Sequence, residues 1–201
     1  MQWTKAIGTL CIMYGHSAAL LSTISNCPPF IKNIQLGGYW VALFLLWSGY
    51  GCVYGAKNKP NYLEHFLKNR FVRLICPFFT AHVIYFIIKS VLGSNFTVRD
   101  ILEGMLGQLN IVEYSWYPVI ALVLYVIWFV IWKRKITEKY KVFMILGGNI
   151  ILIIILEKIF FPREWWYMSI MAFAIGVLLY YIPDKLKNNV GLFSLIYLRY
   201  A

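Results

Sequence analysis

Six long apolar runs constrain this chain more than any other feature of its sequence. They cover roughly residues 5–25, 36–56, 71–92, 114–132, 142–161 and 167–182. A helix of about 20 apolar residues is long enough to cross the hydrocarbon core of a bilayer. Because 61% of the 201 residues are hydrophobic and only 13% are charged, a soluble fold of this size could not bury so much apolar surface. The sequence therefore predicts an all-α, polytopic transmembrane helical bundle, in which residues 1–201 form a single domain.

The positive charge of the chain predicts its orientation. Lys and Arg number 19 against 8 Asp and Glu, which gives a net charge of +11. A nucleic-acid-binding protein would also be basic, but the cations here fall in alternate connections between the runs, as they do in membrane proteins with cytoplasmic Lys and Arg. We therefore predict a cytoplasmic N-terminus and no nucleic-acid partner. The cations assigned to the cytoplasmic side are Lys5, Lys57, Lys59, Lys68, Arg70, Arg73, Lys133, Arg134, Lys135, Lys139, Lys141, Lys185 and Lys187.

Two further segments have predicted roles. Residues 94–113 read as an outside loop with a short amphipathic helix, in which Thr97 caps the start and Asp100 completes an imperfect capping box. From Val190 the chain turns apolar again for about 18 Å of helix, so we expect the start of a seventh span there. The four cysteines form no C-x-x-C pair and no His cluster accompanies them, so neither a metal nor a disulfide is predicted.

His16 is the first candidate for chemistry, because ionisable groups inside a membrane are costly and usually functional. It follows Lys5 by eleven residues, which is three helical turns, so the two residues share a face about 16 Å apart. Burial favours the neutral imidazole, which is the form that a general base requires. A histidine that only hydrogen-bonds between helices remains the alternative interpretation.

Arg70 and Arg73 form a second candidate, at a cytoplasmic helix entrance. Their spacing of three residues places them on neighbouring positions of a helix, and paired guanidinium groups suit phosphate recognition. The alternative is a charged anchor that attracts anionic lipid. Ser48 and Gly49, followed by Gly51 and Gly55, indicate a close-packing helix surface. His82 and Asn149 are interpreted as polar residues that bridge helices.

Several stretches, in this order, resemble the acyltransferase-3 family of multi-span O-acyltransferases that modify bacterial surface glycans. The resemblance covers most of the chain, and lysine stands at position 5 where the family has an arginine. The stretches are Lys5 to His16, Phe44 to Tyr50 with its Ser48-Gly49, Phe66 to Pro77 with Arg70 and Arg73, Ser115 to Tyr117, and more weakly Trp166 to Gly176.

The resemblance implies an acetyl-CoA-dependent acyl transfer to a sugar hydroxyl of a polysaccharide or glycolipid in the bacterial inner membrane. His16 would accept the proton of the hydroxyl. Lys5, Arg70 and Arg73 would bind the CoA phosphates, and Ser48 would steady the thioester carbonyl. Trp116 would lie on the substrate side. The family has about ten helices, so we expect this chain to represent its N-terminal part.

Two other functions remain open at this point. A transporter or flippase component would use the same polar face as a permeation path, with His16 or His82 relaying protons. Such proteins often carry internal repeats and paired broken helices, which are not visible here. A shortened, inactive remnant of an acyltransferase is the third alternative. A chain that consumes no acetyl-CoA but moves solute in vesicles would favour the transporter.

Overall fold

The computed structural model describes residues 2–21, 28, 37–105, 116–160, 167 and 169–182. Every regular element in these ranges is helical, so the predicted all-α class is confirmed. The predicted seventh span and the side chain of Lys5 lie outside the described part. The elements are α1 (Gln2–Leu21), α3 (Gly37–Asn58), α4 (Tyr62–Val91), α5 (Val98–Met105), α6 (Trp116–Trp132), α7 (Glu138–Ile155), the π-helical turn η1 (Leu156–Phe160) and α9 (Ile170–Leu179).

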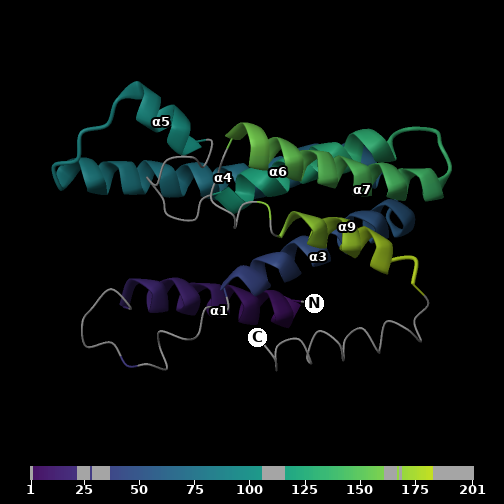
Figure 1. Ribbon diagram of the computed structural model, residues 1–201, viewed down its shortest axis with the longest axis horizontal. Helices are drawn as coiled ribbons and strands as arrows, with labels where there is room; N and C mark the ends of the chain where they lie inside the picture. Colours follow the sequence, from purple (N-terminus) through teal and green to yellow (C-terminus); the bar gives the residue numbers. More distant parts are fainter. Residues whose placement is uncertain are drawn as a thin grey trace.

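The helices lie roughly along one direction, in layers (Figure 1). Helices α4, α6 and α7 form one layer, α3 and α9 pack beneath it, and α1 packs against α3 on the far side from α4. The core forms where the first two layers meet. Its largest fully buried side chains include Trp128 of α6, Phe66 of α4 and Phe173 of α9. This packing brings residues from α3, α4 and α6 together inside the bundle.

Two described helices are long and apolar enough to cross a membrane, namely Tyr62–Val91 and Glu138–Lys158. Only 6% of the apolar window of the first and 28% of the second is buried. A core helix of a soluble protein would be mostly buried, so these exposed apolar faces suit lipid. Helices α6 and α9 are apolar but shorter, with 17 and 10 residues. The structure therefore confirms a helical protein with two membrane-capable helices, and the six-span arrangement stays a prediction.

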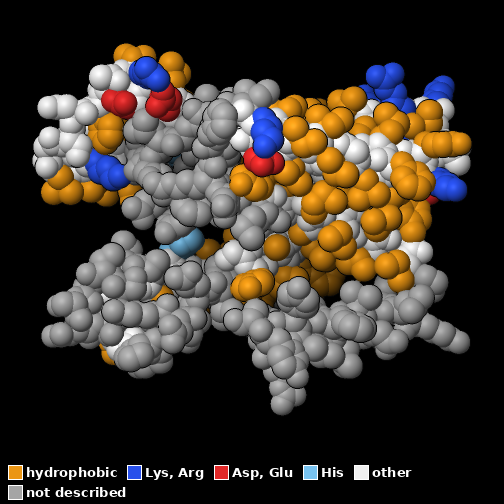
Figure 2. Space-filling model, viewed as in Figure 1, with side chains coloured by type: hydrophobic (Ala, Val, Ile, Leu, Met, Phe, Trp, Pro, Cys, Tyr) orange, Lys and Arg blue, Asp and Glu red, His pale blue; other side chains and the backbone are white. Residues whose placement is uncertain are grey.

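Basic residues gather at the end of the molecule where the α3–α4 and α6–α7 connections meet. Lys57 forms an ion pair with Glu138, and the hydroxyl of Tyr181 donates to the same carboxylate at 3.1 Å. Lys141 donates to the carbonyl of Trp132 at 2.9 Å. Figure 2 shows Lys and Arg side chains at the outer end of a broad hydrophobic surface. We call this region, residues 57–59 and 133–141, the basic end.

Helix α3 crosses α9 at very close range. A Cβ atom added to Gly49 would collide with the carbonyl oxygen of Phe173, and one added to Gly176 would collide with the carbonyl oxygen of Leu46. Only glycine allows two helix backbones to approach in this way. The predicted close-packing surface of α3 therefore has α9 as its partner.

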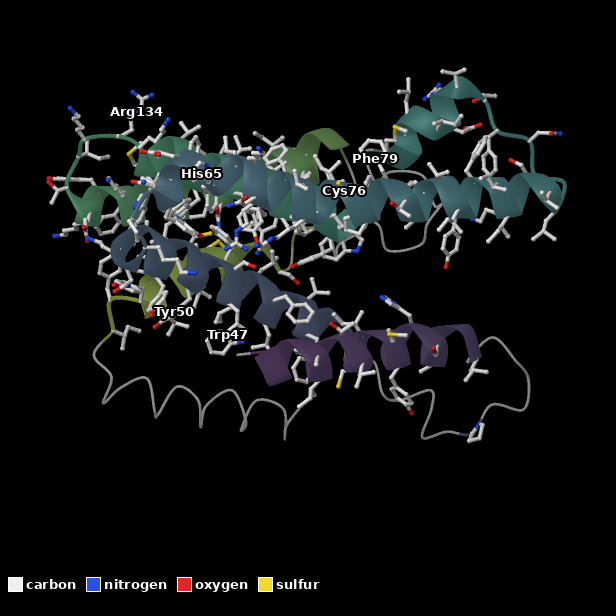
Figure 3. The ribbon with its side chains drawn as sticks, turned by 180° about the vertical axis from the view of Figure 1, so that it is seen from behind. Trp47, Tyr50, His65, Cys76, Phe79 and Arg134 are labelled. Atoms are coloured by element: carbon white, nitrogen blue, oxygen red, sulfur yellow. The ribbon has the colours of Figure 1, made fainter. Side chains whose placement is uncertain are left out.

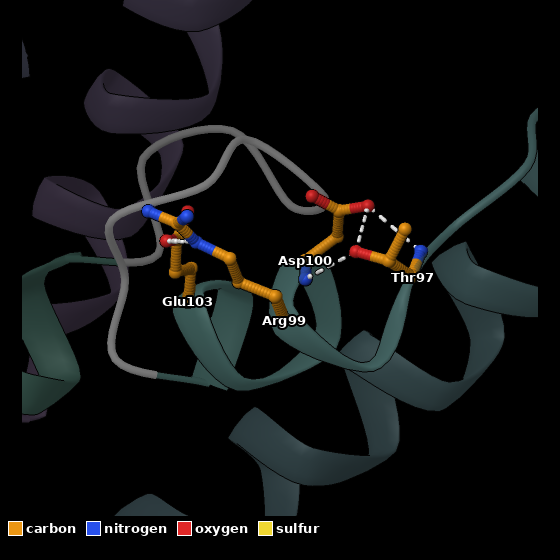
Figure 4. Close-up of polar contacts among 4 residues, drawn as sticks. All are labelled: Thr97, Arg99, Asp100 and Glu103. Atoms are coloured by element: carbon orange, nitrogen blue, oxygen red, sulfur yellow. Dashed lines mark hydrogen bonds and ion pairs between the residues drawn. The ribbon is translucent and has the colours of Figure 1, made fainter.

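A reciprocal capping box begins α5 (Figure 4). The Asp100 carboxylate accepts from the backbone N–H and from the hydroxyl of Thr97, both at 2.7 Å. The backbone N–H of Asp100 donates back to the Thr97 hydroxyl at 3.2 Å. On the next turn, Arg99 pairs with Glu103 at 2.6 Å. The predicted short helix and its Thr97 cap are thus confirmed over Val98–Met105.

The cap makes the start of α5 sensitive to acid. Hydrogen bonds from Thr97, first its backbone N–H and then its hydroxyl, lower the pKa of Asp100 below its ordinary value. Because the folded value is lowered, the stabilising contribution is present above the ordinary pKa of Asp and is lost as the pH falls through the lowered value. A nitroxide label at the exposed Leu102 is expected to become more mobile in this acidic range. In a Glu103→Gln background, Asp100→Asn should abolish this pH-dependent change in the mobility of the label. An unchanged pH dependence would contradict its assignment to Asp100.

Candidate functional site

Arg70 lies in an aromatic cluster inside the bundle. Tyr62, Phe66 and Arg70 are spaced by four residues on α4, so their side chains share one face. The Nη2 atom of Arg70 donates to the Tyr62 hydroxyl at 3.3 Å. Its Cζ atom lies 5.7 Å from the centroid of Phe66 and 4.9 Å from the centroid of Tyr125 on α6. Aromatic faces and one hydroxyl therefore surround this guanidinium group.

The charge of Arg70 has no carboxylate partner among the described residues. The ion pairs found there are Lys57–Glu138, Arg99–Glu103 and Lys158–Glu157. A guanidinium has five N–H donors, and Tyr62 accepts one hydrogen bond from it. Cation–π contacts stabilise the charge without occupying its donors. Arg70 is thus suited to bind an anionic ligand that enters the bundle.

Ser48 of α3 joins this cluster through tyrosines of α6. Its hydroxyl lies near the phenol groups of Tyr117 and Tyr125. The ring of Tyr125 in turn faces Arg70. A continuous set of contacts therefore runs from Ser48 through Tyr125 to Arg70 and Tyr62, across three helices. The structure brings together the predicted residues Ser48 and Arg70, although 22 positions separate them in the chain.

The tyrosines of this cluster were not predicted as site residues. The available signal was their spacing: Tyr62 precedes Arg70 by eight residues on α4, and Tyr117 precedes Tyr125 by eight on α6. Eight residues are slightly more than two turns of helix, which keeps each pair on one face. Trp116, predicted for the substrate side, is buried and meets Tyr117 edge-on, with ring centroids 6.3 Å apart.

Arg73 differs from Arg70 in its surroundings. Its side chain is exposed on α4, because a step of three residues turns it about 60° away from the face of Arg70. The pair is therefore divided into an inward and an outward cation. The predicted phosphate-binding role of each stays a prediction.

His16 lies half-buried on α1. The buried face of this helix carries small residues, Gly8, Gly15 and Ala18, which allow close packing on α3. A Cβ atom on Gly8 would stand only 2.8 Å from Trp40 and 2.9 Å from Phe44. The structure places α1 on the opposite side of α3 from α4 (Figure 1), so His16 and Arg70 belong to different layers.

The other two histidines have contrasting positions. His65 is exposed on α4, at the same end of the molecule as Arg134 (Figure 3). His82 is buried, with Nδ1 2.9 Å from the carbonyl oxygen of Phe78 and Nε2 3.0 Å from the carbonyl oxygen of Gly104. The second contact joins α4 to α5. His82 therefore holds the outer helix in place, in agreement with its interpretation as a bridging residue.

Replacing His82 with alanine is expected to release α5. The mutation removes the hydrogen-bond partner of the buried Gly104 carbonyl, which costs about 1–3 kcal/mol. Limited proteolysis of the connection at residues 92–97 should become faster, while His65→Ala should leave its rate unchanged. An unaltered rate in His82→Ala would show that other contacts hold α5.

Helical architecture, the exposed apolar faces of α4 and α7, and an inward cation are typical of a membrane-associated helical protein with a polar site inside the bundle. The sequence profile of the acyltransferase-3 family, described as an acyltransferase domain, matches residues 1–200. The chain therefore belongs to this family, whose general activity is acyl transfer, and the predicted family resemblance is confirmed. A search of curated proteins gave no match, and neither did a search of solved structures.

Proposed function

We propose that this protein transfers an acetyl group from cytoplasmic acetyl-CoA to a sugar hydroxyl of a cell-surface or exported polysaccharide. It would act in the bacterial inner membrane as a multi-pass helical bundle with a cytoplasmic N-terminus. The observation that carries the proposal is the inward Arg70, which faces the ring of Tyr125 and has no carboxylate partner among the described residues. The chain that holds it matches the family over residues 1–200.

The donor would enter from the basic end. CoA carries several phosphate charges, and Lys and Arg side chains of the α6–α7 connection would attract it before it reaches the bundle. Arg73 and Lys5 would contact phosphates at the entrance, and Arg70 would bind an anionic oxygen further inside. Ser48 would donate a hydrogen bond to the thioester carbonyl, where negative charge develops during attack.

His16 would serve as the general base on the acceptor side. As the sugar oxygen bonds to the thioester carbon, His16 would take the hydroxyl proton. The carbon–sulfur bond then breaks, and the CoA thiolate leaves and regains a proton. Because His16 is half-buried on α1, part of its imidazole stays within reach of a sugar hydroxyl. Trp116 would lie on the acceptor side of the site.

Membranes that contain the full-length gene product, incubated with radiolabelled acetyl-CoA and host glycan, test the proposal. The expected result is label in the glycan, with release of one CoA thiol for each acetyl group transferred. Membranes from the expression host without the protein serve as the control. Failure to bind CoA and to transfer label would overturn the proposal, and solute movement in the same vesicles would then favour the transporter.

A further inference from the structure

A half-buried arginine such as Arg70 needs defined partners if its N–H donors are to point at a ligand. The side chain of Arg70 is flexible, with four rotatable bonds. Its positive charge is also much more stable in water than in the interior of the bundle. Two tyrosines restrain it in different ways. The hydroxyl of Tyr62 accepts from Nη2 at 3.3 Å, and the face of Tyr125 lies under Cζ at 4.9 Å. Together they limit both the position and the orientation of the guanidinium plane.

Both tyrosines are themselves held by the fold. The ring of Tyr62 packs directly against Gly55 of α3, where an added Cβ would collide with the ring atoms, and it meets Phe66 with centroids 5.5 Å apart. Tyr125 is buried at 4% exposure, lies near the hydroxyl of Ser48, and packs edge-on against Phe66, with ring centroids 5.8 Å apart. Neither ring can turn away without disturbing a neighbouring helix.

We infer that Tyr62 and Tyr125 are positioning residues, which hold Arg70 in the orientation that binds an anionic oxygen of the acyl donor. The inference rests on the proposed function for the identity of the donor. It follows from three contacts that converge on one cation and from the absence of a carboxylate partner among the described residues. Gly55 takes part by leaving room for the Tyr62 ring.

The variants separate the two restraints. Tyr62→Phe removes the hydroxyl that accepts from Arg70 and retains the ring. Tyr125→Leu removes the cation–π face, whereas Tyr125→Phe retains the face and loses only the hydroxyl near Ser48. Tyr140→Phe on α7 is the matched control, because that side chain is 63% exposed. Arg70→Lys keeps a charge at the site but loses the planar fork.

The measurement is equilibrium binding of acetyl-CoA to the full-length protein in detergent, together with kcat and KM for acyl transfer. Tyr62→Phe and Tyr125→Leu are expected to raise Kd and KM about three- to thirtyfold, with kcat changed much less. Tyr125→Phe should recover most of the affinity. In the double mutants with Arg70→Lys, the tyrosine substitutions should add little further loss, because they act through Arg70.

The outcomes distinguish this inference from the proposed function. If the wild type binds and transfers acetyl, and the tyrosine variants keep wild-type Kd and KM while only their thermal stability falls, the tyrosines are merely structural and the inference is wrong. Full additivity with Arg70→Lys would also overturn it. If the wild type neither binds acetyl-CoA nor transfers the acetyl group, the proposed function fails and the inference fails with it. Tyr62→Phe, which loses one oxygen atom, keeps the test decisive if Tyr125→Leu does not fold.

Discussion

Replacing His16 with alanine is expected to reduce acyl transfer by about 10²–10⁴-fold, the usual contribution of a general base. The loss should appear in kcat, because His16 is proposed to act on the acceptor hydroxyl and not on the bound CoA. The Kd for acetyl-CoA should stay close to that of the wild type. Parallel measurement of label transfer and CoA binding in the same membranes separates these two quantities.

The other histidines supply the controls for this experiment. His65→Ala removes an exposed imidazole on α4 near the basic end and should leave transfer unchanged. His82→Ala disturbs the α4–α5 contact, so it reports how much activity is lost through structure alone. If His16→Ala retains wild-type kcat, His16 is not the base and its burial on α1 serves packing.

The all-α class and the approximate positions of the helices were predictable, because lipid demands apolar helices of a minimum length; the six-span arrangement stays a prediction. The apolar runs at 36–56 and 114–132 match α3 and α6 within two residues. The prediction differs most at α4, where the run begins at residue 71 but the helix begins at Tyr62. Hydropathy marks only the apolar part of a helix, and α4 continues through Glu64 and Lys68 before it.

The site was predictable only in part. Arg70 stands out because it is paired with Arg73 three residues on at a helix entrance, and Ser48 stands out because it precedes Gly49 within an apolar run. The tyrosines that surround them do not stand out, because the chain has 15 tyrosines and hydropathy does not show which of these side chains point toward the core. The contrast between Arg70 and Arg73 depends in the same way on the rotation of α4 about its axis, which is fixed by packing against α6.

Replacing Gly49 or Gly176 with alanine is expected to destabilise the protein strongly. At both positions the new methyl group meets a backbone carbonyl of the facing helix, Phe173 or Leu46, which cannot rotate aside as a side chain can. Overpacking of this kind costs about 1–3 kcal/mol or more, although alanine gains roughly 0.5–1 kcal/mol of helix propensity over glycine. The Tm in detergent should fall by roughly 3–10 °C.

Gly51→Ala provides the matched control on the same helix. A Cβ at this position meets nothing within 4 Å, so only the gain in helix propensity remains and the Tm should be unchanged or slightly higher.

Gly49→Ala has a second expected consequence, because Gly49 directly follows Ser48. Pushing α3 away from α9 would shift the Ser48 hydroxyl relative to Tyr117 and Tyr125. Acyl transfer by Gly49→Ala should therefore fall even at temperatures below its Tm, where the variant is still folded. Equal stability of the Gly49→Ala and Gly51→Ala variants would show that α3 and α9 can separate without an energetic cost.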